Sequence, residues 1–295
     1  MRKLTDAALT SLDGVMQAPG VRPALLAVLL GASSASSATF AQGAVRPPTP
    51  TIYQSSPERR VVKDKDWGPW LGPFRAKLVP SLMQDFGERY IYAAANLALP
   101  PPKPSERRVV FLGDSITDRW NLAASFPNKP YVNRGIGSQV TAQMVLRFHQ
   151  DVVALKPSAV VILAGTNDVQ GFLQQETTEQ IETNWEAMAD LADRHRIKLV
   201  FASLLPVNNY TDKAKDVLNE RNPAELRTLN AWLRRFCETR GYGYADYYAR
   251  LVDGSGLLDR RLTDDGVHPL IPGYARMAPV AEAAIERVLA ESANQ

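Results

Sequence analysis

Ser115 and His268 stand in short polar segments whose residue types suit nucleophilic chemistry. Ser115 ends a Gly-Asp-Ser sequence after the apolar run 109–112, and His268 lies in Asp-Asp-Gly-Val-His-Pro near the C-terminal end. A serine hydroxyl is a weak nucleophile until an adjacent base takes its proton, and a histidine held by a carboxylate can be that base. Asp265 precedes His268 by three residues; in a tight turn its carboxylate could accept from Nδ1–H and leave Nε2 free. These residues predict acyl transfer through an activated serine.

Each of these residues also has a simpler structural explanation. Serine and aspartate commonly cap helices, so Gly-Asp-Ser alone does not predict catalysis. Asp264 is an alternative carboxylate neighbour of His268. Of the other two histidines, His149 lies near the apolar face of an amphipathic pattern, which indicates a partly buried structural role. His195 ends a charged helical pattern, where a cation interacts favourably with the helix dipole.

Acyl transfer also needs hydrogen-bond donors for the oxyanion of the tetrahedral intermediate. Asn167, in a Gly-Thr-Asn-Asp turn after an apolar run, offers a side-chain NH₂ group, and Ser115 offers its own backbone N–H. The Gly-Ile-Gly-Ser turn over 135–138 offers further backbone N–H groups. Because asparagine in a turn often bonds its own backbone, the prediction depends on these segments occurring together after successive strands.

The elements that must position these residues alternate along the chain. Short apolar runs predict strands buried in a parallel sheet, at 109–112, 131–133, 159–164, 199–204 and 242–245. Amphipathic patterns between and around them predict helices at 82–97, 141–156, 177–194, 223–240 and 273–290. This alternation predicts an α/β fold with helices on both faces of a sheet of about five strands. In such folds, functional residues gather at the carboxyl ends of the strands.

The composition is that of a globular enzyme-sized chain. It has 295 residues, 45% hydrophobic and 22% charged, which is enough for one sizeable domain with flanking segments. A formal charge of +3 favours neither nucleic-acid binding nor a polybasic membrane surface. Cys237 is the single cysteine, so neither an intramolecular disulfide nor a cysteine-based metal site can form, and its amphipathic surroundings predict a core position.

The N-terminal region differs from the rest. Residues 1–41 combine basic residues, the apolar run 24–32 and small residues ending at Ala41, a pattern typical of a signal peptide cleaved after that alanine. The apolar run is too short for a membrane span, so we expect a secreted or periplasmic protein, with a retained N-terminus as the alternative. Residues 42–66 are rich in proline and charge and predict a linker or extended arm, which leaves 67–295 as the domain.

Four blocks of the sequence, taken together, resemble the SGNH hydrolase superfamily, also called GDSL-like lipases or acylhydrolases. The similarity extends from about Trp67 to Leu289. It implies a flavodoxin-like three-layer α/β/α sandwich and ester hydrolysis without metal or cofactor. The blocks are FLGDSITD (111–118), NRGIGSQVTAQ (133–143), LAGTND (163–168) and DDGVHP (264–269).

The resemblance also implies roles for individual residues. Ser115 would be the nucleophile, His268 the base and Asp265 the acid that orients it, with Asn167 as the side-chain oxyanion donor. The oxyanion glycine of the family falls on Ser138, with Gly137 as the neighbouring candidate. A serine there can still donate its N–H, but a positive φ would add about 1–2 kcal/mol of strain. Its hydroxyl would also lie at the mouth of the site, so we expect altered acyl-chain tolerance.

The expected substrate is a short-chain carboxylic ester, a small molecule or a glycan ester, hydrolysed through an acyl-enzyme intermediate. Alternatives are a carbohydrate deacetylase, a lysophospholipase, a thioesterase or an inactive glycan-binding module. Nucleotide binding is disfavoured because neither GxGxxG nor GxxxxGK[ST] occurs. The polar segment 207–222 predicts part of the rim; Tyr210, its one aromatic residue, could contact substrate or pack on the surface. We expect no nucleic-acid partner and no integral membrane span.

Overall fold

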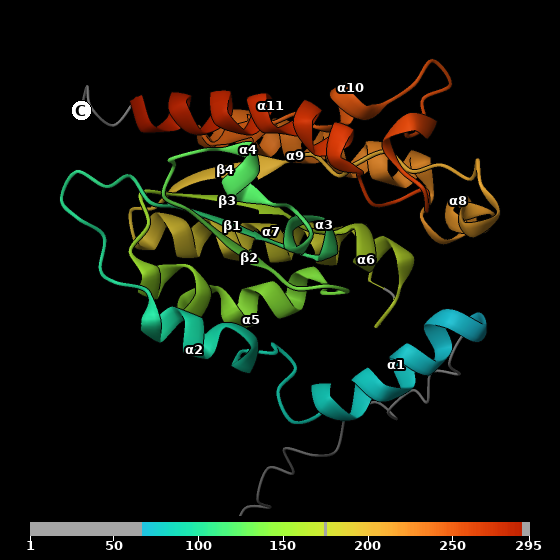
Figure 1. The fold of residues 1–295 in the computed structure, drawn as a ribbon, viewed down its shortest axis with the longest axis horizontal. Coiled ribbons are helices and arrows are strands. Elements are labelled where there is room, and N and C mark those ends of the chain that lie inside the picture. The colour runs from blue at the N-terminus through green and yellow to red at the C-terminus, as the bar shows by residue number, and fades with distance from the viewer. Residues whose placement is uncertain (1–66, 174–175, 291–295) are drawn as a thin grey trace, which may run out of the picture. The chain divides into compact units, whose positions relative to one another are not determined.

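The computed structural model describes residues 67–173 and 176–290, which form a sheet with helices on both faces (Figure 1). The predicted signal peptide and linker lie outside the described residues. Five parallel strands have the order β2-β1-β3-β4-β5, the flavodoxin-like arrangement. The predicted α/β fold is confirmed. The strands are β1 (Val109–Gly113), β2 (Tyr131–Gly135), β3 (Ala159–Leu163), β4 (Lys198–Ala202) and β5 (Gly243–Ala245).

The central strands are buried on both faces, as their apolar sequences predict. Every residue of β1 and β3 is buried, and Val109 pairs in register with Tyr131 of β2 and with Ala159 of β3. The strands β2 and β3 lie on opposite sides of β1, so the chain leaves β1 first in one direction and later continues in the other. Their carboxyl ends therefore frame a topological switch point, where ligands bind in open α/β sheets.

Helices of different lengths connect and cover the strands. The predicted helix 223–240 is observed with the same bounds. The α-helices are α1 (Gly68–Leu82), α2 (Tyr90–Ala98), α3 (Ser115–Asp118), α4 (Leu122–Ser125), α5 (Thr141–Asp151), α6 (Thr166–Gln170), α7 (Thr178–Arg194), α8 (Val217–Glu220), α9 (Pro223–Arg240), α10 (Tyr248–Leu251) and α11 (Ile271–Ala290). Within the described residues, none is long and apolar enough to cross a membrane.

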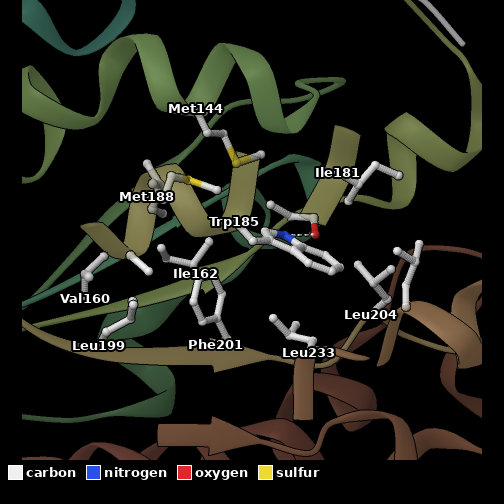
Figure 2. Packing of buried hydrophobic residues seen from close by; sticks show 14 of the residues in the cluster. Met144, Val160, Ile162, Ile181, Trp185, Met188, Leu199, Phe201, Leu204 and Leu233 are labelled. Carbon is white, nitrogen blue, oxygen red and sulfur yellow. Dashed lines mark hydrogen bonds between the residues drawn. The ribbon is translucent and has the colours of Figure 1, made fainter. Parts of the chain in front are cut away.

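Two hydrophobic clusters hold the layers together. On one face of the sheet, α5, α7 and α9 pack over side chains that include Ile162 and Phe201, with Trp185 at the centre (Figure 2). On the other face, α3, α10 and α11 pack over the alternate residues of the same strands, including Phe111 and Val161. Cys237 is buried in the first cluster, as predicted, and burial raises the pKa of its thiol to about 12.

The predicted helix 82–97 is wrong in its first half, because α1 ends at Leu82 and α2 begins only at Tyr90. Glu88, between them, adopts a positive φ of 50°, which interrupts a right-handed helix. Its buried carboxylate accepts a hydrogen bond from Gln139 at 3.0 Å. These contacts with a distant segment override the helical pattern of the local sequence.

Trp185 of α7 links the core to the turn that follows β3. Its side chain is fully buried, and the indole Nε1–H donates to the carbonyl of Ala164 at 3.2 Å (Figure 2). A Cβ on Gly165 would lie 3.2 Å from the indole ring, and this glycine has a φ of +126°. The indole therefore supports the turn that leads into α6 and Asn167.

We expect Trp185→Ala to lower the free energy of unfolding by about 3–5 kcal/mol, because it leaves a large buried cavity. Trp185→Phe keeps an aromatic ring but loses the bond to Ala164, so its loss should be smaller. Urea unfolding followed by circular dichroism measures both. Leu146→Ala, at an α5 side chain that is 55% exposed, is the control and should change stability by less than about 0.5 kcal/mol. Equal losses in both Trp185 variants would contradict the packing argument.

Candidate active site

Ser115 is the first residue of α3 and is separated from the end of β1 only by Asp114. Asp114 caps this helix by accepting from the Ile116 N–H at 2.9 Å. Gly113 is required by space, since a Cβ there would lie 2.7 Å from the Leu163 carbonyl oxygen of β3. This sharp turn places the half-buried Ser115 side chain at the carboxyl edge of the sheet.

The structure brings Ser115, His268 and Asp265 into one hydrogen-bonded chain. Ser115 Oγ lies 2.8 Å from His268 Nε2, although 153 positions separate them in sequence. His268 Nδ1 lies 2.6 Å from Asp265 Oδ2. Because an ionised carboxylate only accepts, Nδ1 carries the proton and Nε2 can accept from the serine. Asp264, the alternative carboxylate, is exposed and pairs with Lys213 at 3.3 Å.

The charge of Asp265 is fixed by its surroundings. Burial acts to raise the pKa of this carboxyl, but the hydrogen bond and charge of His268 outweigh it, with help from the backbone N–H of Val267 and of His268, and hold the pKa well below its usual range. Oδ1 accepts from the two N–H groups at 3.0 and 2.8 Å, while Oδ2 is left for the imidazole. The carboxylate therefore stays ionised and sets the orientation of the ring.

The turn that carries His268 is held from two directions. Gly266 has a φ of +80°, and a Cβ on it would lie 2.3 Å from the Asn208 carbonyl oxygen. The Asn208 N–H donates to the Gly266 carbonyl at 3.0 Å. From α11, the Tyr274 hydroxyl donates to the Ile116 carbonyl of α3 at 2.7 Å. The turn of His268 and the helix that follows it are thus connected both to the loop after β4 and to the helix that begins at Ser115.

The loop after β2 lies against the nucleophile. A Cβ on Gly135 would lie 2.1 Å from the Asp118 backbone nitrogen of α3, so the loop enters in close contact with that helix. A Cβ on Gly137 would lie 3.8 Å from Ser115 Cβ. Ser138 is half-buried and has a φ of +67°, the left-handed conformation that glycine adopts without strain. Ser138 therefore holds a backbone conformation that favours glycine and strains a serine.

Asn167 lies against the same loop, with its amide held at both ends. Nδ2 donates to the Gln139 carbonyl at 3.0 Å, and Oδ1 accepts from Arg221 at 3.3 Å. Because an amide NH₂ has two protons, one N–H beyond the bond to Gln139 can donate elsewhere. The backbone N–H groups of Ser115 and Ser138 also have no acceptor among the described residues. The three predicted donor groups therefore border one loop beside the serine hydroxyl.

Arg221 is a site residue that the sequence does not reveal. Its side chain is buried and donates to Gln170 at 2.6 Å as well as to Asn167. Because Arg221 can only donate, the Asn167 oxygen must face it and the NH₂ group must face the loop. A single arginine in the polar segment 207–222 has no spacing relation to Asn167, so no sequence pattern predicts the contact.

Tyr210 and the other histidines lie apart from this constellation. The Tyr210 hydroxyl donates to Asp253 at 2.8 Å, and no contact with Ser115 or His268 is found in the part of the chain described. The prediction of a partly buried His149 is wrong: it is exposed on α5, because the helix turns it away from the core, and its ring lies 5.9 Å from that of His195. Among the described residues, no cluster of histidine, cysteine and carboxylate side chains could hold a metal ion.

We expect Ser138→Gly to raise the free energy of unfolding by up to about 1 kcal/mol. Glycine relieves about 1–2 kcal/mol of backbone strain in the folded state. It also gives the unfolded chain more conformational entropy, which lowers the free energy of unfolding by roughly 0.4–1 kcal/mol. Chemical denaturation measures the difference. Ser138→Ala keeps the strain, so its free energy of unfolding should not rise. A rise in that variant would show that loss of the hydroxyl, and not relief of strain, causes the stabilisation.

Asp168, next to Asn167, makes stability depend on pH. Its Oδ1 accepts from the backbone N–H and the hydroxyl of Thr141, while Oδ2 is buried without a partner among the described residues. Burial raises the pKa of Asp168 to about 7 despite the bonds from Thr141, and Glu176 adds to the rise. The folded state thus holds a proton that the unfolded chain, with a carboxyl pKa of about 3.9, has already lost. Stability should fall as pH rises between these values.

Between about pH 5 and about pH 8, the free energy of unfolding should therefore fall less in Asp168→Asn than in the wild type, because an amide mimics the protonated carboxyl. Burial also raises the pKa of Asp114, to about 6, so some dependence should remain. Urea unfolding at both pH values measures the effect, with the exposed Asp264→Asn as control. An undiminished pH dependence in Asp168→Asn would refute the assignment.

Comparisons with known proteins agree with this architecture. A family model described as the GDSL-like Lipase/Acylhydrolase family matches residues 111–276. The solved structure of a proposed acylhydrolase from Bacteroides fragilis is 34% identical, with 70% of this chain and 99% of that chain covered and a TM-score of 0.65. A GDSL-like lipase from Bacteroides thetaiotaomicron is also 34% identical, with 69% and 99% covered and a TM-score of 0.64.

A more distant structure shares the fold. It comes from Streptococcus pneumonia, is described as a platelet activating factor, and is 21% identical, with 72% of this chain and 99% of that chain covered and a TM-score of 0.62. No curated protein matches the chain significantly. The family match spans more than half of the 295 residues, and the two Bacteroides structures share a third of their aligned residues with it. The chain belongs to the GDSL-like lipase/acylhydrolase family.

Proposed function

We propose that this protein is a serine esterase that hydrolyses short-chain carboxylic esters through an acyl-enzyme intermediate. The observation that carries the proposal is the continuous hydrogen-bonded chain from Ser115 Oγ through His268 to Asp265, with contacts of 2.8 and 2.6 Å. A catalytically inactive glycan-binding module would have no need of an accepting imidazole nitrogen aimed at a serine. The signal-peptide pattern of residues 1–41 supports action in the periplasm or outside the cell.

Acylation begins when His268 Nε2 takes the proton of Ser115 and the serine oxygen attacks the ester carbonyl carbon. The imidazolium that forms is stabilised by the ionised Asp265 at Nδ1. His268 then gives its proton to the leaving alcohol oxygen as the carbon–oxygen bond breaks. In the second half, His268 deprotonates a water molecule, which attacks the acyl-enzyme and releases the acid and the free serine.

The tetrahedral oxyanion would be stabilised by three donors: the free N–H of Asn167 Nδ2 and the backbone N–H groups of Ser115 and Ser138. Arg221 acts as a positioning residue, because its bond to Oδ1 keeps the Asn167 amide in the donating orientation. Preorganised donors of this kind lower the barrier because they need no reorganisation when the charge develops.

The side of the site that carries the oxyanion donors is closely packed, and this favours short acyl groups. Asn167 is 5% exposed, Arg221 is 7% exposed and Gln139 is fully buried. Phe172, which follows α6, is buried and packs against Trp67 and Phe74 of the α1 region. A large acyl chain on this side would have to displace packed residues, whereas an acetyl group would not.

The test is hydrolysis of p-nitrophenyl esters from acetate to laurate by the wild type and by folded variants. Ser115→Ala should lose turnover to the background rate, and Asn167→Ala should lose about 10²–10³ in kcat because one oxyanion donor is removed. His149→Ala, at an exposed α5 histidine whose ring lies beside that of His195, is the matched control for His268→Ala and should retain full activity. Turnover that persists in Ser115→Ala would reject the serine mechanism.

A further inference from the structure

We propose that the groove between α4 and the first half of α11 binds the leaving alcohol of the ester, and that this alcohol is uncharged and largely apolar. The inference rests on the proposed esterase activity and deepens it, because it names the class of substrate. It concerns the surface beside His268, which the oxyanion donors do not touch.

The groove is a cavity of about 780 Å³ that begins at His268. Trp120 and Tyr274 form buried parts of its wall, and Ala275 and Ala278 of α11 lie along its length. Cavities that bind small molecules typically measure about 300–1,000 Å³, so this one has room for far more than a methanol or ethanol group.

The position of the groove assigns it to the leaving group. During attack by Ser115 on the ester carbonyl carbon, the carbonyl oxygen must point to the donors, which lie on the loops that carry Ser138 and Asn167. The leaving oxygen must instead lie within reach of His268 Nε2, which protonates it. The groove is lined by His268, Pro269 and Leu270, and neither oxyanion loop contributes to it. A substituent on the leaving oxygen therefore enters the groove, whereas the acyl group does not.

The charged residues around the groove already have partners of opposite charge. Glu282 pairs with Lys129 at 2.8 Å, and Asp264 pairs with Lys213 at 3.3 Å. Arg119 lies 3.8 Å from Asp265. An alcohol that carried a phosphate or a quaternary amine would have to compete for these groups. The arrangement favours an uncharged alcohol.

Two acceptor atoms that polar side chains present to the groove are already engaged. Asn121 Oδ1 accepts from the Ala124 N–H at 3.0 Å, and Ser125 Oγ accepts from the Trp120 indole at 2.8 Å. A sugar would require several donors and acceptors that are free to recognise its hydroxyls. By contrast, Leu270 and Ile271, which follow Pro269, are 42% and 85% exposed, which is unusual for large apolar side chains. An apolar alcohol would cover both, so we expect esters of alkyl or aryl alcohols rather than sugar esters.

Two substrate series separate the alcohol side from the acyl side: acetates of ethanol, butanol and hexanol, and ethyl esters of acetic, butyric and hexanoic acids. These alcohols have similar acidity, so differences in kcat/KM within the first series report binding rather than leaving-group chemistry. In the wild type, kcat/KM should rise at least about tenfold from ethyl to hexyl acetate, because each methylene buried in a fitting pocket contributes about 0.8 kcal/mol or more.

Ala278→Trp should fill the groove and reduce the hexyl-to-ethyl acetate ratio by about tenfold or more, without changing the hexanoate-to-acetate ratio. Ile271→Ser, at an exposed rim position, should reduce the hexyl-to-ethyl acetate ratio more weakly. It tests the groove independently of whether the bulkier Ala278→Trp variant folds. Ala283→Trp places the same side chain at an exposed α11 position outside the groove, and both ratios should match the wild type.

Two results would overturn the inference while leaving the esterase assignment intact. A hexanoate-to-acetate ratio that falls in Ala278→Trp, with the hexyl-to-ethyl ratio unchanged, would place the acyl chain in the groove. Ratios that do not change in either groove variant would show that the groove does not bind substrate. Failure of the esterase assignment is distinguishable, since the wild type would then hydrolyse no ester or Ser115→Ala would remain active.

Discussion

A single buried guanidinium, that of Arg147 on α5, holds together the parts of the sheet edge on which the site depends. It donates to the carbonyl of Gly113 at the end of β1, to the carbonyl of Arg134 in β2 and to the side chain of Gln139, at 3.0, 2.8 and 2.6 Å. Its charge is balanced by Asp151 at 3.0 Å, one turn later on the same helix. Both side chains are fully buried, so loss of either would leave an uncompensated charge in the core. The arginine thereby fixes the glycine of the Gly-Asp-Ser turn and the residue after Ser138 relative to each other.

The strands and the aspartate–histidine pair are visible in the sequence because their signals are local. Five apolar runs bounded by polar turns suffice to predict the sheet, and the spacing of Asp265 and His268 lies within one turn. Arg147 and Arg221 give no such signal. Their partners are backbone carbonyls and amides of distant segments, and an arginine in a helical pattern has the same appearance whether it faces solvent or the core. The strain at Ser138 could be anticipated only from the resemblance, which implies a glycine at this position and hence a positive φ.

Helix boundaries at the start of the domain fail for a related reason. The segment before Tyr90 has a helical composition, yet the Phe86 carbonyl and the Glu88 carboxylate bond to Gln143 and Gln139 of the β2–α5 region. Those glutamines in turn connect to Arg147 through Gln139 Oε1. Differences in helix propensity change stability by a few tenths of a kcal/mol per residue, whereas leaving a buried polar group unpaired costs about 1–3 kcal/mol. The polar network therefore determines where α1 ends and α2 begins.

The same network makes the site asymmetric about Ser115. On the donor side, the loop of Ser138 and the amide of Asn167 are connected to Arg147 and Arg221 by buried hydrogen bonds, so this side cannot widen without breaking several of them. On the base side, the turn of His268 is held by the loop after β4, and the surface beyond it, towards Ile271, is open and carries exposed apolar side chains. Rigidity is required where charge develops and must meet fixed donors. In the proposed reaction, an open surface on the side where the alcohol departs would permit its release, so the two sides of Ser115 would meet opposite physical demands.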